Sequence, residues 1–415
     1  MVALQSTTVK LTILESSPGR APAIAGLENG PRSIGAVKVL RLSITDRCNF
    51  RCVYCMPADG VRWLAHEQIL SFEEICDVVR SAIEFHGIQR FKLTGGEPTV
   101  RHGLVELVGM LRRIPGIEDL SLTTNGQRMD ELAYPLRQAG LDRVTISIDS
   151  LLPEKFHRIT RTGNLCTVLK GLDRCEEVGF DSVKINCVTM RGVNDDELAD
   201  FARLTLCRRL SVRFIEYMPL GDSALMDPDE SSLQSNPSAA KIGGRLQFAG
   251  AVDRGGNGGM IGGRSAVAAE ELGPAGGCGA QDRGADSLIP EAEVRQLIAR
   301  QLGPLVPVDP SEESGVGPAR MYQLAWGNPV GRIGFISAMS APFCATCNRL
   351  RLTANGVLRS CLFDGGEVDV RTILRENPDP ATRRKAVAQA MVDCVRLKPA
   401  VHSRHGNEQM SRIGG

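Results

Sequence analysis

The sequence lacks several features that mark secreted, membrane-spanning and nucleic-acid-binding proteins. No apolar run reaches the roughly 18 residues of a membrane-spanning helix, and the N-terminus carries no apolar core of a secretory signal. A dominant charge is also missing, because 49 basic residues face 48 acidic ones and leave a formal net charge of +1. We therefore expect a soluble, unsecreted protein without a membrane span and without an overall charge that would attract nucleic acid.

The 13 cysteines fall into two tight clusters and a scattered remainder. An unsecreted chain keeps its thiols reduced and available to metals, so a disulfide framework is not expected. The two clusters are Cys48, Cys52 and Cys55, and Cys344, Cys347 and Cys361. We predict that the others are small buried hydrophobic residues: Cys76, Cys166, Cys175, Cys187, Cys207, Cys278 and Cys394.

Residues 37–221 alternate short β-rich runs with amphipathic helical stretches, which is the pattern of repeated βα units. The pattern predicts an α/β fold, a partial (βα)6 barrel of the TIM type or an open sheet, with the chemistry in loops after the strands. Strands are predicted over Lys38–Ile44, Arg90–Leu93, Asp119–Thr123, Arg143–Ile148, Ser182–Cys187 and Ser211–Tyr217. A helix is predicted over Ser71–Phe85, with Ser71 as its N-terminal cap.

The remaining segments divide by composition. Residues 1–36 are predicted to be poorly ordered or a targeting segment, and the Gly- and Ser-rich residues 222–287 a disordered insertion. Residues 288–415 should fold as a C-terminal extension of antiparallel strands and helix that ends in a Gly-Gly tail. Its predicted elements are a helix over Pro290–Gln301, strands over Met321–Ala325, Arg332–Ile336, Arg349–Leu352 and Val357–Ser360, and a helix over Thr382–Arg396.

The first cysteine cluster has the spacing Cys-x3-Cys-x2-Cys and follows the first predicted strand. Three thiolates fill three corners of a [4Fe–4S] cubane and leave one iron open to chelate the amino and carboxylate groups of S-adenosylmethionine. A structural zinc is the alternative, but it needs a fourth ligand and none lies nearby.

The turn Thr94–Pro98 closes the second predicted strand with the sequence Thr-Gly-Gly-Glu-Pro. Gly95 and Gly96 permit close approach of backbone to a ligand, and Glu97 can accept a hydrogen bond from its ammonium group. A Gly-Gly turn alone is a weak signal, because most are only turns. When the Gly-Gly turn follows a cysteine triplet in the sequence, it becomes a strong signal of a ligand site.

The second cluster again offers three cysteines, so we predict a second [4Fe–4S] cluster with an open iron. Zinc with a distant histidine is the alternative. Arg349 and Arg351 alternate on a predicted strand and face one side, where two guanidinium groups suit phosphate oxygens. Arg41, Lys92 and Lys184 add cations on strands of the same barrel, although each alone would more often be a solvated charge.

With the Cys-x3-Cys-x2-Cys and Gly-Gly-Glu-Pro motifs intact, the chain resembles the radical S-adenosylmethionine superfamily, whose usual core is a partial (βα)6 barrel. The two triplets and the Gly-Gly tail make it similar to the GTP 3',8-cyclase family, also called molybdenum cofactor biosynthesis protein A. The resemblance implies S-adenosylmethionine contacts for Tyr54, Gly96, Ser147 and Met218. Without the motifs, Tyr54 and Met218 would be read as plain core residues.

The same resemblance implies how GTP is bound and converted. The implied GTP contacts are Arg41, Lys92, Thr123, Lys184, Arg349, Leu350 and Arg351. The family usually has arginine at the position of Lys92, and we expect Arg349 to be catalytic as well. The second cluster would bind guanine, and the tail would reach the site. A 5'-deoxyadenosyl radical would take H3' of GTP, and the C3' radical would close onto C8, giving 3',8-cyclo-7,8-dihydro-GTP.

The family also implies partners and a compartment. These are an electron donor of flavodoxin or ferredoxin type, a homodimer, and the cyclic pyranopterin monophosphate synthase that takes the product. The mitochondrial matrix is expected for a eukaryotic source and the cytoplasm otherwise. Two other functions compete: a radical enzyme that modifies peptides or proteins, which usually has more C-terminal cysteines, and an electron carrier with two clusters, which would ligate every iron.

Overall fold

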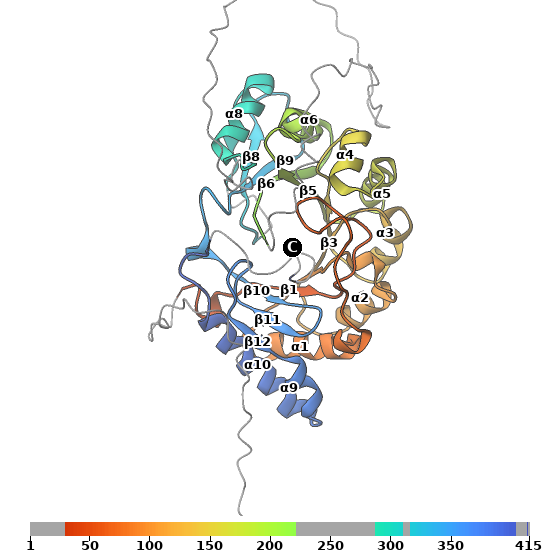
Figure 1. Ribbon diagram of the computed structural model, residues 1–415, viewed down its shortest axis with the longest axis vertical. Helices are drawn as coiled ribbons and strands as arrows, with labels where there is room; N and C mark the ends of the chain where they lie inside the picture. Colours follow the sequence, from red (N-terminus) through yellow and green to blue (C-terminus); the bar gives the residue numbers. More distant parts are fainter. Residues whose placement is uncertain (1–29, 221–286, 310–315, 404–412, 414–415) are drawn as a thin grey trace, which may run out of the picture.

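The computed structural model describes residues 30–220, 287–309, 316–403 and 413, and the coloured ribbon in Figure 1 follows these parts. The predicted N-terminal segment over 1–36 is described only from residue 30, and the predicted insertion over 222–287 only at residue 287. The predictions for Cys278 and for the terminal Gly414 and Gly415 lie outside the described residues. Within the described part, no helix combines the length and the apolar composition needed to cross a membrane.

Six strands alternate with helices between residues 39 and 216, and every predicted strand is confirmed with ends within two residues. The strands are β1 (Val39–Ser43), β2 (Arg90–Thr94), β3 (Asp119–Thr124), β4 (Arg143–Ser147), β5 (Ser182–Thr189) and β6 (Leu210–Glu216). The helices are α1 (Phe72–His86), α2 (Leu104–Arg112), α3 (Met129–Gln138), α4 (Pro153–Thr160), α5 (Leu165–Glu177) and α6 (Leu198–Cys207). Short 3-10 helices are η1 (Ile34–Ala36), η2 (His66–Gln68), η3 (Pro98–Val100) and η4 (Asp195–Glu197).

Helix α1 shows how local sequence sets an element. The Ser71 hydroxyl accepts a hydrogen bond from the Glu74 backbone N–H (3.2 Å), and the Glu74 carboxylate accepts one from the Ser71 N–H (2.7 Å). This reciprocal capping box satisfies two N–H groups that the helix itself cannot pair. Gly87, with φ of +63°, then ends the helix in the left-handed conformation that glycine adopts most readily.

The strands form one mixed sheet in the order β12-β11-β10-β1-β2-β3-β4-β5-β6-β9-β8-β7. Neighbours from β1 to β6 are parallel and consecutive, and they curve round a central space (Figure 1). Among the described residues no hydrogen-bonded pairing closes the ring. The predicted α/β class and partial (βα)6 barrel are therefore confirmed.

The C-terminal region extends both edges of this core. Strand β9 (Arg332–Ile336) pairs parallel with β6, and β10 (Arg349–Leu352) pairs parallel with β1. Antiparallel strands continue outward from each: β8 (Arg320–Leu324) and β7 (Leu305–Pro307), and β11 (Val357–Arg359) and β12 (Glu367–Asp369). Residues 337–348, which we call the crossing segment, thus connect the two edges of the barrel.

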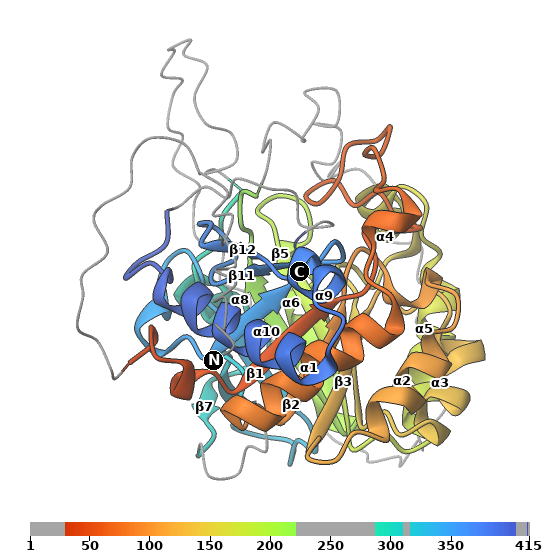
Figure 2. The same cartoon turned by 90° about the horizontal axis from the view of Figure 1, so that it is seen from below.

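Among its described residues, the C-terminal region also contains the helices α8 (Glu291–Leu302), α9 (Arg371–Glu376) and α10 (Pro380–Arg396). Helix α10 lies along α1 (Figure 2). Arg383 on α10 forms an ion pair with Asp77 on α1 (2.5 Å), and the His86 ring contacts the Ala388 carbonyl (2.9 Å). Helix α10 also packs on β11 and β12, so its contact with α1 helps to hold this edge of the sheet next to the barrel.

The core strands alternate between two different environments. On β1, Leu40 and Leu42 are fully buried in the main hydrophobic core, whereas Arg41 between them faces the interior of the barrel. Successive side chains of a strand point to opposite faces, so one face packs against the helices and the other lines the central space. Parallel strands are usually apolar on both faces. The polar inward face therefore indicates a binding cavity.

The scattered cysteines are mostly core residues. Cys76, Cys175, Cys187 and Cys394 are buried, as predicted. The prediction is wrong for Cys166 and Cys207, which are exposed. Both lie on amphipathic helices, α5 and α6, at positions that the helical period places toward solvent.

Two helical glycines give opposite predictions for stability. A Cβ at Gly171 on α5 would lie 2.7 Å from the Gly126 carbonyl oxygen, whereas a Cβ at Gly109 on α2 has no closer neighbour than an Arg113 side-chain atom at 3.6 Å. We expect Gly171→Ala to lower the free energy of unfolding by about 1–3 kcal/mol, because backbone must move. Gly109→Ala should raise it by about 0.5–1 kcal/mol through helix propensity. Urea unfolding of the metal-free proteins measures both, and changes of the same sign would contradict this packing.

Candidate active site

One cavity of about 350 Å³ gathers nearly all the predicted site residues. It is lined by inward side chains of the strands, by the loops that follow β1 to β6, and by the crossing segment. The predicted residues that line it are Arg41, Cys48, Cys52, Tyr54, Cys55, Lys92, Gly95, Gly96, Glu97, Thr123, Ser147, Lys184, Met218, Cys344, Cys347, Arg349, Arg351 and Cys361. Segments far apart in the sequence thus contribute to a single space.

Leu350 is the exception among the predicted residues. Its side chain is fully buried in the main hydrophobic core, on the face of β10 opposite to Arg349 and Arg351. Alternation along the strand requires this arrangement. A contact between Leu350 and GTP stays a prediction, and only its backbone is placed to make one.

The first cysteine triplet lies after β1 in residues 44–56, which we call the cysteine loop. Burial, with Glu97 adding to it, raises the pKa of the Cys48 thiol to about 11. Burial raises the pKa of Cys52 well above its usual value, and the neighbouring Cys55 and Asp149 act in the same direction. Without a metal these two thiols are therefore protonated at neutral pH, and iron binding must release protons. Three thiols at one end of an enclosed cavity fit a cluster that keeps one corner for a ligand.

The Gly-Gly turn is shaped by the cysteine loop itself. The Gly96 N–H donates to the Thr45 carbonyl and the Glu97 N–H donates to the Arg47 carbonyl, each at 2.7 Å. A Cβ at Gly96 would lie 2.3 Å from the Arg47 oxygen, and one at Gly95 2.4 Å from the Thr45 oxygen. The glycines are therefore required by contact with the protein's own backbone, whatever ligand approaches the other side.

The Glu97 carboxylate is occupied within the protein. One oxygen accepts from the Thr99 N–H (3.0 Å), the Thr99 hydroxyl (2.6 Å) and the Thr124 hydroxyl (2.6 Å), and the other accepts from the Asn125 N–H (2.6 Å). Three of these four hydrogen bonds fall on one oxygen, so the other oxygen keeps one lone pair that can accept a further hydrogen bond. The described bonds therefore make Glu97 a link between β2 and β3, and its contact with an ammonium group stays a prediction.

Tyr54 is held by a buried carboxylate. Its hydroxyl donates to one oxygen of Asp149 (2.7 Å), and the other oxygen accepts from the Val188 N–H (2.8 Å). Burial raises the pKa of Asp149 to about 6, although both hydrogen bonds act against that shift. The pair ties the cysteine loop to the ends of β4 and β5, so Tyr54 has a fixed position on the cavity wall.

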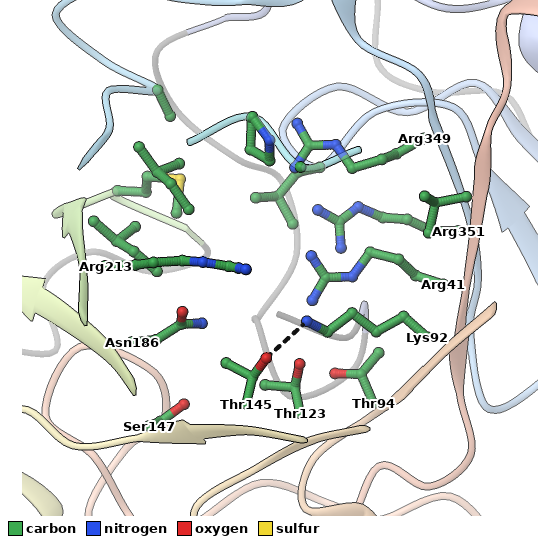
Figure 3. A pocket seen from close by; sticks show the side chains of 18 of the residues that line it. Arg41, Lys92, Thr94, Thr123, Thr145, Ser147, Asn186, Arg213, Arg349 and Arg351 are labelled. Carbon is green, nitrogen blue, oxygen red and sulfur yellow. Dashed lines mark hydrogen bonds between the residues drawn. The ribbon is translucent and has the colours of Figure 1, made fainter. Parts of the chain in front are cut away.

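A row of cations forms one wall of the cavity, with Arg351 buried and the others half-buried. Arg351 on β10, Arg41 on β1 and Lys92 on β2 are in register across the three strands. Figure 3 shows these three and Arg349 stacked along this wall, with their charged ends toward Arg213 on the opposite side. Burial and the charge of Arg351 lower the pKa of Arg41 well below its usual value, and burial with Arg41 does the same for Lys92. A guanidinium group stays charged, so this wall favours a strongly anionic ligand.

Two residues that the sequence analysis missed complete the opposite wall. Asn186 lies two residues after Lys184 on β5, and Arg213 is its register partner on β6. All three line the cavity. The side-chain oxygens of Asn186 and Thr123 are buried and have no hydrogen-bond partner among the described residues, which fits a polar ligand. Period-two alternation along Ser182–Cys187 and Ser211–Tyr217 was the signal that would have found them.

The second triplet belongs to the crossing segment and to the end of β11. Cys344 starts η8 (Cys344–Thr346), and the Arg349 guanidinium lies over the Phe343 ring at 4.9 Å. Burial acts to raise the pKa of Cys347, but the charges of Arg349 and Lys398 outweigh it and lower that pKa. Lys398, also missed, donates to the carbonyls of Cys347 (3.0 Å) and Arg349 (3.1 Å).

The surroundings of the cysteines differ from a single-ion site and include a residue close to the Gly-Gly tail. Within the described part of the chain, no group of three or more His, Cys, Asp or Glu side chains is gathered as a single-ion site. Ile413, the residue before the Gly-Gly tail, is buried with Leu220 and Phe363, and Met218 and Cys361 pack against this cluster. The chain therefore reaches the cavity wall just before its last two residues.

The hydrogen bonds of Glu97 predict an effect on the metal-free protein. In Glu97→Gln an NH₂ group replaces one acceptor oxygen and faces donors, so we expect the free energy of unfolding to fall by about 1–3 kcal/mol. Glu131→Gln, a carboxylate that is 74% exposed, is the control and should change it by less than about 0.5 kcal/mol. Chemical denaturation without iron measures both. Equal stability of Glu97→Gln and the unchanged protein would mean that the carboxylate is kept for a ligand.

Comparisons with known proteins agree with this geometry. Residues 42–205 match the model of the Radical SAM superfamily, and residues 271–404 match that of Molybdenum Cofactor Synthesis C. Among solved structures, SuiB of Streptococcus suis, bound to its precursor peptide SuiA, aligns with 44% of this chain and 39% of its own at 19% identity and a TM-score of 0.36. A likeness of that extent adds no argument about function.

The similarity to curated relatives extends over most of the chain. The GTP 3',8-cyclase of Pelotomaculum thermopropionicum is 40% identical over 383 residues, which are 91% of this chain and 98% of the relative. The GTP 3',8-cyclase of Petrotoga mobilis is 36% identical over 92% of this chain and 98% of its own, and that of Pseudomonas putida is 37% identical over 88% and 90%. Identity of this extent, together with a radical-enzyme barrel and its cysteine loop, shows the family: the chain belongs to the GTP 3',8-cyclases, which are radical S-adenosylmethionine enzymes.

Proposed function

We propose that this chain converts GTP into 3',8-cyclo-7,8-dihydro-GTP, in the first step of molybdenum cofactor biosynthesis. The observation that carries the proposal is the sharing of one cavity by two cysteine triplets and a wall of cations. An electron carrier needs no cation wall, and a peptide-modifying enzyme needs none that suits a triphosphate. The names of the relatives support GTP as the substrate.

In this proposal Cys48, Cys52 and Cys55 hold the first [4Fe–4S] cluster. When bound, this cluster supplies the electron that splits S-adenosylmethionine into the hydrogen-abstracting radical. The residues proposed to hold S-adenosylmethionine are Tyr54, Gly95, Gly96, Glu97, Ser147 and Met218. Tyr54 is fixed by Asp149, and the backbone of the Gly-Gly turn lies against the cysteine loop. Both constraints support one orientation of the cosubstrate beside the cluster.

The cation wall is proposed to bind the triphosphate of GTP. Arg41, Lys92, Arg349 and Arg351 lie on one side and Arg213 lies on the other (Figure 3). Lys184 lines the same cavity from β5. Arginine binds phosphate oxygens through two parallel N–H bonds, which fixes orientation as well as position. Lys92, where the family usually has arginine, keeps the charge without the planar fork. Its ammonium group also donates to Thr145 at 3.2 Å. Thr123 offers the same ligand a hydroxyl that has no hydrogen-bond partner within the described part of the chain.

The second triplet, Cys344, Cys347 and Cys361, is proposed to hold a second [4Fe–4S] cluster with an open iron near the guanine. The lowered pKa of Cys347 favours the thiolate that an iron ligand needs. The crossing segment carries this site across the opening of the barrel, where it helps to enclose the substrate. Enclosure protects a reactive radical from side reactions with water or with other C–H bonds.

Several parts of this proposal follow from the family and not from residues of the cavity. They are the division into units over 37–221 and 288–415, a flavodoxin- or ferredoxin-type electron donor, a homodimer, transfer of the product to cyclic pyranopterin monophosphate synthase, and the compartment, mitochondrial matrix or cytoplasm. Each stays a proposal that follows from the family. An assay with GTP and competing nucleotides in the absence of oxygen tests the central claim, and conversion of another nucleotide in place of GTP would overturn it.

A single substitution separates GTP binding from S-adenosylmethionine cleavage. Arg351→Ala removes one charge-assisted contact, so we expect the KM for GTP to rise about tenfold, equivalent to about 1.4 kcal/mol. Cleavage of S-adenosylmethionine without GTP should change less than about twofold, because Arg351 lies outside the first triplet. Arg203→Ala, on the outer face of α6 where it pairs with Asp200, is the control. Equal losses of both activities would point to a folding defect.

Iron content distinguishes the second cluster from zinc. Protein reconstituted without oxygen should bind about eight irons per chain, as two four-iron clusters require. Replacing Cys344, Cys347 and Cys361 together by Ala should lower this to about four and abolish conversion of GTP, while cleavage of S-adenosylmethionine continues. Metal analysis by mass spectrometry measures both proteins. A stoichiometric zinc that disappears with the three cysteines would contradict the second cluster.

A further inference from the structure

The last residues of α4 and the turn that follows them lie directly against the cysteine loop. This α4 turn, residues Ile159–Gly163, offers two backbone carbonyls to the loop: the Arg51 N–H donates to Thr160 and the Val53 N–H donates to Ile159, both at 3.0 Å. These bonds hold the residues on either side of Cys52. The α4 turn therefore acts on the shape of the loop, although it does not line the cavity.

Side chains of the α4 turn add to this attachment. One nitrogen of the Arg161 guanidinium donates to the carbonyls of Arg51 (2.9 Å) and Met56 (3.0 Å). Arg51 directly precedes Cys52, and Met56 directly follows Cys55. The same group thus joins both ends of the segment that carries two of the cysteines and the tyrosine between them.

The conformation of Arg161 is unusual for an arginine. Its φ is +61° and its ψ is −34°, and among the described residues only Asn328 is another non-glycine residue with positive φ. Glycine commonly occupies such a position after a helix, because a Cβ makes it unfavourable. Strained backbone concentrates where the surrounding structure uses it. The contacts of the guanidinium are the compensation that glycine would not provide.

The α4 turn also packs closely against the loop. A Cβ at Gly163 would lie 2.8 Å from the Phe50 ring and 2.6 Å from the Thr160 hydroxyl. Phe50, two residues after Cys48, also packs edge to face against Phe156 on α4, with ring centroids 6.1 Å apart. The Thr162 hydroxyl donates to the Asn49 carbonyl at 2.8 Å. Every residue of the turn except Gly163 thus makes a hydrogen bond to the cysteine loop.

We infer that Arg161 is a positioning residue for the first cluster: it sets the spacing of Cys52, Tyr54 and Cys55 before iron binds. A loop already held at both ends loses less conformational freedom when it ligates a cluster, so the metal binds more tightly and in one geometry. Because Arg161 lies outside the cavity lining, it acts through the loop and touches neither cosubstrate nor substrate.

The first test uses the metal-free protein. Arg161→Gly removes the guanidinium contacts but also relieves the cost of a positive φ, because glycine has no Cβ. These two effects oppose each other, so we expect the melting temperature to stay within a few degrees of the unchanged protein. Amide hydrogen exchange in residues 49–56, followed by mass spectrometry, should become at least tenfold faster. Asn328→Gly is the matched control, because Asn328 is also a non-glycine residue with positive φ but lies away from the loop. Hydrogen exchange in residues 49–56 of this variant should not change.

The second test uses the reconstituted enzyme. In Arg161→Gly, release of iron from the first cluster to a chelator should become at least tenfold faster, and the change that S-adenosylmethionine causes in the electron paramagnetic resonance spectrum of the reduced cluster should be altered. Arg161→Lys keeps a positive donor and should recover part of both. Normal exchange, iron release and spectrum in Arg161→Gly would overturn the inference. A glycine variant that does not fold, judged by circular dichroism, would overturn it too, since the residue would then be needed for more than the loop.

Discussion

Three cations, one buried and two half-buried, stand next to one another at the centre of this molecule, because Arg41 on β1 is in register with Arg351 on β10 and with Lys92 on β2. Neighbouring strands lie roughly 4.8 Å apart, and two unit charges about 4 Å apart repel by about 4 kcal/mol at an effective dielectric constant of 20. A fold that accepts this repulsion must hold β10 beside β1 by other contacts. The packing of α10 on α1, with the Arg383–Asp77 ion pair, provides them.

The cysteine loop is positioned by a different kind of interaction. The Gly-Gly turn binds its N-terminal part through backbone hydrogen bonds to Thr45 and Arg47, and the α4 turn binds the part around Cys52. The Tyr54–Asp149 hydrogen bond forms a third attachment. These bonds are short-range and directional, so they fix geometry more sharply than charge does. The charges of the cation wall thus favour an anionic ligand, whereas hydrogen bonds fix the position of the cysteine loop.

The C-terminal region makes the barrel into an enclosed site. By adding β9 to one edge and β10 to the other, it brings the crossing segment, with Cys344 and Cys347, over the space between them. The same region contributes Arg349, Arg351 and Lys398 to the cavity wall. A barrel of six βα units alone would have the first triplet but only half of the cation wall. The C-terminal region therefore supplies the other half of this wall.

The sequence by itself determined the features that depend on residues close together in the chain. Spacing identified both triplets, alternation identified the six strands, and Ser71 with Glu74 identified the start of α1, because ligand spacing, side-chain period and capping are all local.

Only the tertiary structure decided which of these features meet. It placed Arg213 and Asn186 opposite the predicted cations, turned Leu350 away from the cavity, and tied the Glu97 carboxylate to the end of β3 by hydrogen bonds. Such outcomes depend on sheet register and on contacts between loops that lie far apart in the sequence, and no local pattern carries that information.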